Sequence, residues 1–147
     1  MSPLRAETAT GQGIGGKVAE KPAILVVEDD ALLHEMIEDA LTEGGFEVAI
    51  APSGEEAVTL MAGLKDKYVA LVTDINLLGR IDGWQVARHA RQVDSQFPIV
   101  YMTGASADDW GANGVPNSIL LAKPFAPAQL VTAVSQLLNA PPAGSPT

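Results

Sequence analysis

The sequence predicts an α/β domain in which helices cover both faces of a five-stranded parallel sheet. Short apolar runs of strand length recur along the chain, and most are followed by a segment with the apolar spacing of an amphipathic helix. The apolar runs are continuous, as expected for strands that are buried on both faces. Regular alternation of strands and helices implies right-handed crossovers between parallel strands.

The first half of the chain is predicted to hold two strands and two helices. Residues 23–27 form a buried strand that ends in the acidic turn Glu28-Asp29-Asp30, and a helix then runs to Gly44-Gly45. Residues 46–51 form the second strand, and the capping-box sequence Ser53-Gly54-Glu55-Glu56 begins the second helix. The apolar positions of these helices are Leu33, Ile37, Ala40 and Leu41, then Ala57, Val58, Leu60, Met61 and Leu64.

The second half of the chain continues the alternation, with one weak helix. Strands are predicted at residues 68–73, which end at Asp74, and then at 98–102 and 118–122. A helix is predicted from Gly83 to Arg91, and a last helix begins at Ala126-Pro127 with Pro in its first turn. The polar segment 105–117 supports at most one or two helical turns around Ala107 to Gly111, so the fourth helix is predicted to be short or irregular.

One domain is expected at residues 23–139, with a disordered extension at 1–22 and a disordered tail at 140–147. The extension contains Gly11-Gln12-Gly13-Ile14-Gly15-Gly16-Lys17, which matches the glycine spacing of nucleotide-binding loops. Such loops need a strand before them and a helix after them, and neither is predicted here. We therefore do not interpret residues 11–17 as a nucleotide site.

Composition excludes several classes of partner. The 147 residues include 18 acidic residues against 9 Lys and Arg, a net charge of −9, so neither nucleic acid nor an anionic membrane is an expected partner. Cysteine is absent, and no apolar run is long enough for a membrane span. These observations predict a cytoplasmic protein. They leave its oligomeric state open between a monomer and a weak dimer.

Polar residues follow the predicted strands at the edge where an open α/β sheet carries its sites. In a flavodoxin-like, doubly wound sheet of order 2-1-3-4-5, Glu28, Asp29, Asp74, Thr103 and Lys123 should converge. An Asp at a strand end is by itself usually a turn residue or a helix cap. Three carboxylates placed together are unfavourable without a cation, and Mg²⁺ prefers oxygen ligands. The set therefore predicts a phosphoryl-transfer site with a carboxylate nucleophile.

With these residues in place, the chain resembles a response-regulator receiver domain of bacterial two-component signalling over about residues 23 to 139. The matching segments, in order along the chain, are Val26-Val27-Glu28-Asp29-Asp30, Val72-Thr73-Asp74-Ile75-Asn76, Asp82-Gly83, Met102-Thr103-Gly104-Ala105 and Lys123-Pro124-Phe125. No single segment is diagnostic, but the five occur in order at the right spacings. Two further segments are Gly114-Val115-Pro116 and Leu121-Ala122-Lys123-Pro124-Phe125-Ala126-Pro127. In these segments the chain also resembles the single-domain receivers that accompany sensor histidine kinases in alphaproteobacteria.

The resemblance implies a role for each site residue. Asp74 would accept a phosphoryl group from a phosphohistidine on a sensor histidine kinase or a histidine phosphotransfer protein. Mg²⁺, or Mn²⁺ in its place, would be held by Asp29 and Asp74, by Glu28 through water, and by the backbone carbonyl of Asn76. Thr103 and Lys123 would contact the phosphoryl oxygens. The Lys123-Pro124 peptide bond is expected to be cis.

The sequence departs from the family pattern in three places. Leu120 stands three residues before Lys123, where the family usually carries Tyr or Phe. The loop after Asp74, residues 77–81, lacks the customary proline and is one residue longer. The short fourth helix carries Asp108, Asp109 and Trp110 where an amphipathic helix normally lies. The usual route from phosphorylation to output is therefore not assumed for this chain.

Two alternatives to a phosphoacceptor remain open. A Mg²⁺-dependent phosphatase with an aspartate nucleophile would need a second acid two residues after Asp74, where this chain has Asn76. A pseudo-receiver would bind partners without phosphate chemistry. The presence of Asp29, Asp74, Thr103 and Lys123 argues against this alternative. We expect no turnover of external substrates. We also expect no effector domain after Lys123, so the chain would signal by contact with a partner protein or act as a phosphate sink.

Four further residues are expected to have structural roles. His34 and His89 are interpreted as surface residues, because a phosphorylated histidine is typically found in a helical bundle. Trp84 and Trp110 are interpreted as packing or partner-contact residues.

Overall fold

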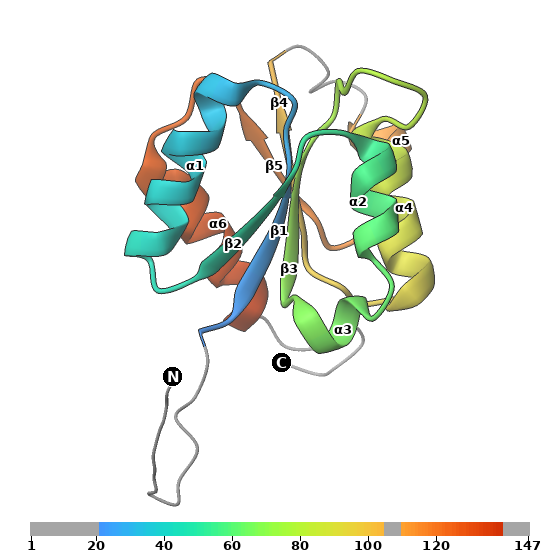
Figure 1. The fold of residues 1–147 in the computed structure, drawn as a ribbon, viewed down its shortest axis with the longest axis horizontal. Helices are drawn as coiled ribbons and strands as arrows, with labels where there is room; N and C mark the ends of the chain where they lie inside the picture. Colours follow the sequence, from blue (N-terminus) through green and yellow to red (C-terminus); the bar gives the residue numbers. More distant parts are fainter. Residues whose placement is uncertain (1–20, 105–109, 140–147) are drawn as a thin grey trace, which may run out of the picture.

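The computed structural model describes residues 21–104 and 110–139, which form a five-stranded parallel sheet of order β2-β1-β3-β4-β5 (Figure 1). The strands are β1 (Ala23–Val27), β2 (Glu47–Ala51), β3 (Ala70–Asp74), β4 (Ile99–Thr103) and β5 (Ile119–Ala122). The helices are α1 (Ala31–Glu43), α2 (Gly54–Leu60), α3 (Leu64–Lys67), α4 (Gly83–Val93), α5 (Trp110–Asn113) and α6 (Pro127–Asn139). The predicted flavodoxin-like, doubly wound fold is confirmed.

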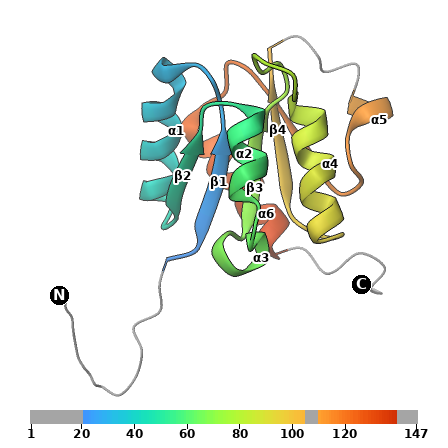
Figure 2. The same ribbon diagram turned by 45° about the vertical axis from the view of Figure 1, so that its right-hand side comes forward.

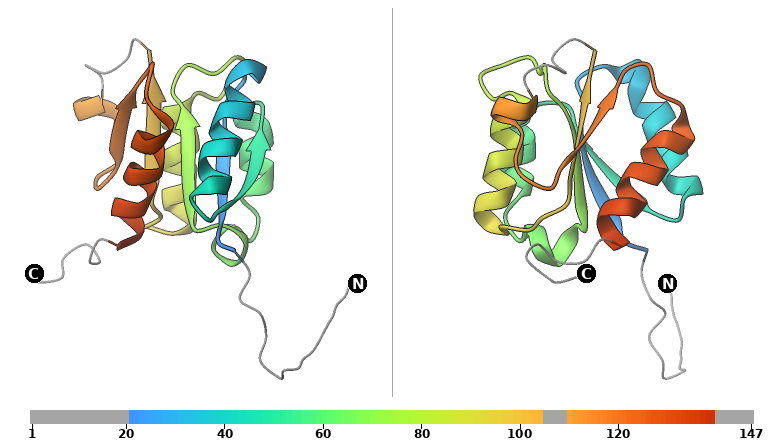
Figure 3. Two further views of the ribbon diagram at one scale, coloured as in Figure 1. Left: turned by 90° about the vertical axis from the view of Figure 1, so that its left-hand side faces the viewer. Right: turned by 180° about the vertical axis from the view of Figure 1, so that it is seen from behind.

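Helices cover both faces of the sheet, which explains why its strands are apolar throughout. Helices α1 and α6 lie on one face, and α2, α3 and α4 lie on the other (Figures 1 and 3). Successive residues of β1 point to opposite faces: Leu25 and Val27 join the core under α2 and α4, whereas Ile24 and Val26 join the core under α1 and α6. All four of these side chains are fully buried.

Side-chain caps at three helix N-termini explain where these helices begin. The Oδ1 atom of Asp30 accepts a hydrogen bond from the Leu32 amide at the start of α1. The cap predicted at Ser53 is present, because Ser53 Oγ accepts from the Glu56 amide. A complete capping box, which the sequence analysis missed, is formed in α4 by Asp82 and Gln85.

The prediction of one helix from Ser53 to Leu64 is wrong. Helix α2 ends at Leu60, and the four-residue helix α3 begins at Leu64. Gly63 lies between them with a φ of 73°, a left-handed backbone conformation that interrupts a helix and that glycine adopts without strain. The apolar spacing continues across this break because Met61 and Leu64 are both buried in the same core.

The segment between β4 and β5 contains little helix in the part that the structure describes. Helix α5 has four residues, Trp110–Asn113, in agreement with a short fourth helix, while residues 107–109 of the predicted turn lie outside the described residues. Arg91 of α4 holds the chain ahead of β5, because its guanidinium donates to the carbonyl oxygens of Phe97 and Pro116, each at 2.7 Å. The bond from Arg91 to Pro116 and the burial of Val115 therefore hold this segment against the rest of the fold.

Some predictions fall outside the described residues. The glycine-rich segment 11–17, residues 1–20 of the predicted extension and the predicted tail at 140–147 are among them. Among the described residues, no helix combines the length and the apolar character that a membrane span requires.

Candidate functional site

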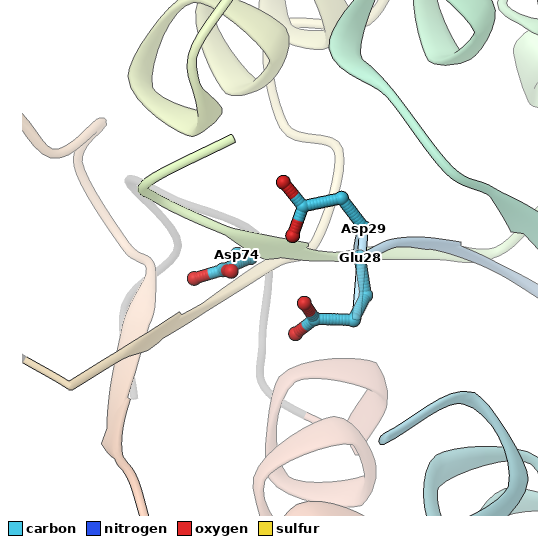
Figure 4. A group of neighbouring side chains, drawn as sticks. All are labelled: Glu28, Asp29 and Asp74. Atoms are coloured by element: carbon cyan, nitrogen blue, oxygen red, sulfur yellow. The ribbon is translucent and has the colours of Figure 1, made fainter. Parts of the chain in front are cut away.

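Three carboxylates meet at the carboxyl edge of the sheet. Glu28 and Asp29 directly follow β1, and Asp74 is the last residue of β3, which pairs with β1 in parallel. Each contributes a carboxylate oxygen to a group in which these atoms all lie within 4.8 Å of one another (Figure 4). Glu28 is 0% exposed and Asp74 is 6% exposed. The predicted convergence of these acids is therefore present.

Lys123 supplies positive charge to this group of carboxylates. It follows β5, and its Nζ atom lies 3.0 Å from Glu28 Oε1 and 3.3 Å from Asp74 Oδ2. Burial alone would lower the pKa of Lys123, but the hydrogen bond to Glu28 and the charge of Asp74 outweigh it and raise the pKa. The Lys123-Pro124 bond is cis, as predicted. Lys123 thus holds an ammonium group between two of the three carboxylates.

Both carboxylate oxygens of Glu28 accept hydrogen bonds, although burial of its charge is unfavourable. Its Oε1 atom accepts from Lys123, and its Oε2 atom accepts from the Asp30 amide at 3.0 Å. Burial raises the pKa of Glu28, and the charge of Asp74 adds to this effect, while the bonds from Lys123 and Asp30 oppose it. A carboxyl group at this position therefore favours a nearby cation.

His34 has a role that the sequence analysis missed. We expected a surface residue, but its ring is half-buried and its Nε2 atom contacts the backbone carbonyl oxygen of Glu28. This contact ties α1 to the turn that carries Glu28 and Asp29. No sequence pattern indicated it, because it depends on how α1 packs against the end of β1.

Thr103 and Asn76, the other predicted site residues, lie on neighbouring segments. Thr103 ends β4, is 1% exposed, and its backbone carbonyl accepts from the Lys123 amide at 2.7 Å. Asn76 is exposed and follows Asp74 by two residues in the loop that leads to α4. Gly83 brings the start of α4 close to the site, since a Cβ atom there would lie 2.1 Å from the Asp74 carbonyl oxygen. The five residues Glu28, Asp29, Asp74, Thr103 and Lys123 therefore share one edge of the sheet, as predicted.

The donor set fits a hard divalent cation. Three carboxylates at short range, two of them buried, require positive charge, and oxygen ligands of this kind suit Mg²⁺. Lys123 contacts Glu28 and Asp74, and one carboxylate oxygen of Asp29 accepts from the Leu78 amide at 2.9 Å. The ammonium group neutralises part of the charge, which still leaves the group net negative if all three carboxylates are ionised.

An aromatic ring lies beside position 120, on the neighbouring strand. Tyr101 of β4 pairs in register with Leu120 of β5 and is 0% exposed. Its ring centroid lies 4.8 Å from that of Trp84, and its hydroxyl oxygen accepts from the Val115 amide at 3.1 Å. Burial raises the pKa of Tyr101. The sequence analysis missed this residue, since a tyrosine within an apolar strand carries no separate signal.

The two tryptophans have structural contacts, as the sequence analysis proposed. Trp84 is 8% exposed and belongs to the core under α2 and α4. Trp110 is partly exposed in α5, which lies beside α4 in Figure 2, and its Nε1 atom donates to Ser118 Oγ at 3.0 Å. Ser118 Oγ in turn donates to the Val115 carbonyl at 2.7 Å. These bonds connect α5 to the start of β5.

The chain is similar to several known proteins. A family model described as the response regulator receiver domain matches residues 24–135. A response regulator receiver protein from Sinorhizobium medicae WSM419 is 49% identical, with a TM-score of 0.77 over 82% of this chain and 97% of that structure. The receiver domain of the sensor histidine kinase PA1611 from Pseudomonas aeruginosa, solved with magnesium coordinated in its active-site cleft, is 26% identical, with a TM-score of 0.69 over 82% of this chain and 100% of that structure.

The curated relatives that match are longer proteins. The transcriptional regulatory protein PrrA of Mycobacterium tuberculosis is 35% identical over 120 residues, which make up 80% of this chain and 50% of PrrA. The chain therefore spans about half the length of this relative.

Proposed function

The chain belongs to the response regulator receiver domain family, and from this premise we propose that Asp74 is its phosphoacceptor. The phosphoryl group would come from a phosphohistidine on a sensor histidine kinase or a histidine phosphotransfer protein. The observation that carries the proposal is the position of Asp74. It ends β3 at 6% exposure, 3.3 Å from Lys123 Nζ and grouped with Glu28 and Asp29.

Each residue of the site has a proposed part in the transfer. A carboxylate oxygen of Asp74 attacks phosphorus, the bond from phosphorus to the histidine nitrogen breaks, and the imidazole leaves with its electron pair and takes up a proton. Lys123 Nζ, which now bridges Asp74 and Glu28, would pair with a phosphoryl oxygen. The Thr103 hydroxyl would donate a hydrogen bond to another phosphoryl oxygen from the end of β4.

Mg²⁺ is the proposed cofactor, and Mn²⁺ is compatible with the same ligands. Asp29 and Asp74 would hold it directly, Glu28 through water and Asn76 through its backbone carbonyl. When bound, the ion would neutralise charge on the carboxylates and the phosphoryl oxygens. The buried carboxylates of Glu28 and Asp74 support this assignment.

Turnover of external phosphate esters is not part of the proposal. An aspartate-nucleophile phosphatase needs an acid two residues after its nucleophile, and an amide, Asn76, stands there. A phosphorylation-independent pseudo-receiver would have no use for a lysine held between two site carboxylates. We propose that signalling proceeds by protein contact or as a phosphate sink in the cytoplasm, without DNA binding by these residues.

The decisive experiment is phosphoryl transfer in vitro. The chain is incubated with a phosphorylated histidine donor, or with acetyl phosphate, and acyl phosphate is detected by mass spectrometry with and without Mg²⁺. We expect labelling of the wild type only with Mg²⁺ and no labelling of Asp74→Asn. Asp66→Asn, which changes an exposed acid in α3, is the matched control and should label normally. Undiminished labelling of Asp74→Asn would refute the proposal.

A further inference from the structure

The loop between β3 and α4 is held by two carboxylates that come from different parts of the fold. The Leu78 amide donates to Asp29 Oδ2 at 2.9 Å, and the Arg80 amide donates to Glu55 Oε2 at 3.1 Å. In Figure 1 this loop passes over the N-terminal end of α2, where Glu55 lies. One anchor is therefore a candidate metal ligand, and the other is a residue outside the proposed site.

Glu55 fits closely against the backbone of this loop. A Cβ atom on Gly79 would lie 2.8 Å from Glu55 Oε2, and Gly79 has a φ of 101°, so a side chain would be disfavoured there on both counts. The hydrogen bond from the Arg80 amide holds the pKa of Glu55 below its ordinary value, and the Ile81 amide contributes in the same direction. Glu55 is therefore an ionised acceptor at neutral pH.

The start of α2 packs directly against the end of the same loop. A Cβ atom on Gly54 would lie 2.4 Å from the carbonyl oxygen of Ile81. By contrast, Leu78 near the middle of the loop is 77% exposed, so its side chain adds little packing. Leu77 and Ile81 pack against the core at the two ends of the loop, and between them the hydrogen bonds to Asp29 and Glu55 hold the backbone at Leu78 and Arg80.

We propose that Glu55 is a positioning residue that governs how long the phosphoryl group on Asp74 survives. By accepting the Arg80 amide, Glu55 keeps the loop of residues 77–81 against Asp29 and limits the access of water to the acyl phosphate. This inference rests on the proposed function of Asp74. Glu55 itself touches neither Asp74 nor the phosphoryl group and acts only through the loop.

The step that Glu55 controls is hydrolysis of the acyl phosphate. A water oxygen attacks phosphorus, the bond from phosphorus to the Asp74 oxygen breaks, and Asp74 leaves as a carboxylate with the bonding electron pair. Inorganic phosphate is the other product, and the two protons of the attacking water remain on phosphate or pass to the solvent. A loosened loop gives water more approaches to phosphorus, so hydrolysis should be faster.

The test compares Glu55→Ala and Glu55→Gln with the wild type and with Glu56→Ala. Each protein, as the 147-residue chain, is phosphorylated by acetyl phosphate with Mg²⁺, the donor is removed, and the remaining acyl phosphate is followed over time. We expect decay about threefold faster in Glu55→Ala, because the loosened loop gives water more approaches to phosphorus. Glu55→Gln should be close to the wild type, since its carbonyl oxygen still accepts the Arg80 amide. Glu56→Ala removes an equal charge from the next residue of α2 and should decay as the wild type does.

Amide hydrogen exchange supplies a readout that does not depend on phosphorylation. The Arg80 amide should be protected in the wild type and in Glu55→Gln, and it should exchange faster in Glu55→Ala. An unprotected Arg80 amide in the wild type would overturn the inference, and so would wild-type decay in Glu55→Ala. Failure of the wild type to accept phosphate at all would instead overturn the proposed function.

Discussion

Tyr101 and Leu120 pair in register on adjacent strands, and Tyr101 places a buried aromatic ring beside the position that lacks one. Leu120 stands where the receiver family usually carries Tyr or Phe. Tyr101 instead connects β4, which ends at Thr103, with the segment before β5 through its bond to the Val115 amide. The strand that carries the proposed phosphoryl contact is thus joined to the segment before β5, whose described part contains only the four-residue helix α5.

Removal of the Tyr101 hydroxyl should destabilise the fold. Tyr101→Phe keeps the ring against Trp84 but leaves the Val115 amide without its acceptor. Since Val115 is buried, we expect a loss of about 1 to 2 kcal/mol in the free energy of unfolding, measured by urea denaturation. Faster hydrogen exchange at Val115 should accompany it. Tyr68→Phe is the control, and equal losses in the two variants would contradict this explanation.

Loss of the Lys123 charge should destabilise the protein most at neutral pH. In Lys123→Met the buried Glu28 and Asp74 carboxylates face each other without their ammonium partner, and we expect a loss of about 3 kcal/mol in the absence of Mg²⁺. Burial raises the pKa of Glu28 above 4.5, so protonation favours the folded state, and the loss should shrink as the pH falls through the raised pKa. Urea denaturation from pH 4 to 8 measures this, with Lys65→Met as control. A loss independent of pH would contradict it.

The wild type should also lose stability at high pH through Lys123. Its contacts raise the pKa above 10.5, so the folded state holds the proton more tightly than the unfolded state. The resulting stabilisation is complete below about pH 10.5 and is lost as the pH rises through the raised pKa. Denaturation between pH 9 and 11.5 should therefore show a steeper decline for the wild type than for Lys123→Met. Parallel declines would mean that Lys123 does not hold its proton in this way.

Mg²⁺ should stabilise the wild type through Asp29. A ligand present at 100 times its dissociation constant stabilises the state that binds it by about 2.7 kcal/mol, so the melting temperature should rise with Mg²⁺. Asp29→Asn removes one carboxylate of the proposed site and should abolish most of this rise. Asp39→Asn, an exposed acid in α1, should retain it. A full rise in Asp29→Asn would exclude Asp29 as a ligand.

Arg91 should contribute more stability than Arg88, although both contact the segment before β5. Arg91 donates to Phe97 and Pro116 at 2.7 Å each, whereas Arg88 makes one 3.3 Å contact with the Asn113 carbonyl. We expect Arg91→Ala to lose about 2 kcal/mol, since two carbonyl groups lose a charged donor, and Arg91→Lys to recover only part of it. Arg88→Ala should be near neutral. Urea denaturation distinguishes them, and similar losses would count against the anchoring role of Arg91.

The fold and most of the proposed site were accessible from the sequence for local reasons. Apolar runs of strand length and helical apolar spacing are local patterns, so the strands were predicted correctly. Their order was predicted from the alternation of strands and helices, which favours a doubly wound sheet. Parallel strands place their carboxyl ends at one edge, which was enough to group Glu28, Asp29 and Asp74. Local apolar patterns did not predict the end of α2. The apolar spacing continues past Gly63, but the left-handed conformation of Gly63 interrupts the helix.

Contacts across the fold were beyond the reach of these patterns. The sequence predicted that Lys123 lies near Glu28 and Asp74, but not that its Nζ atom contacts both carboxylates. The pairing of Tyr101 with Leu120 and the bond from the Arg80 amide to Glu55 also join residues on different elements. Periodicity states which face of a strand or helix is buried, but it does not state which side chain on a neighbouring element faces it. Register and helix packing determine those distances, because hydrogen bonds and ion pairs change with shifts of less than 1 Å or so, far smaller than any sequence pattern resolves.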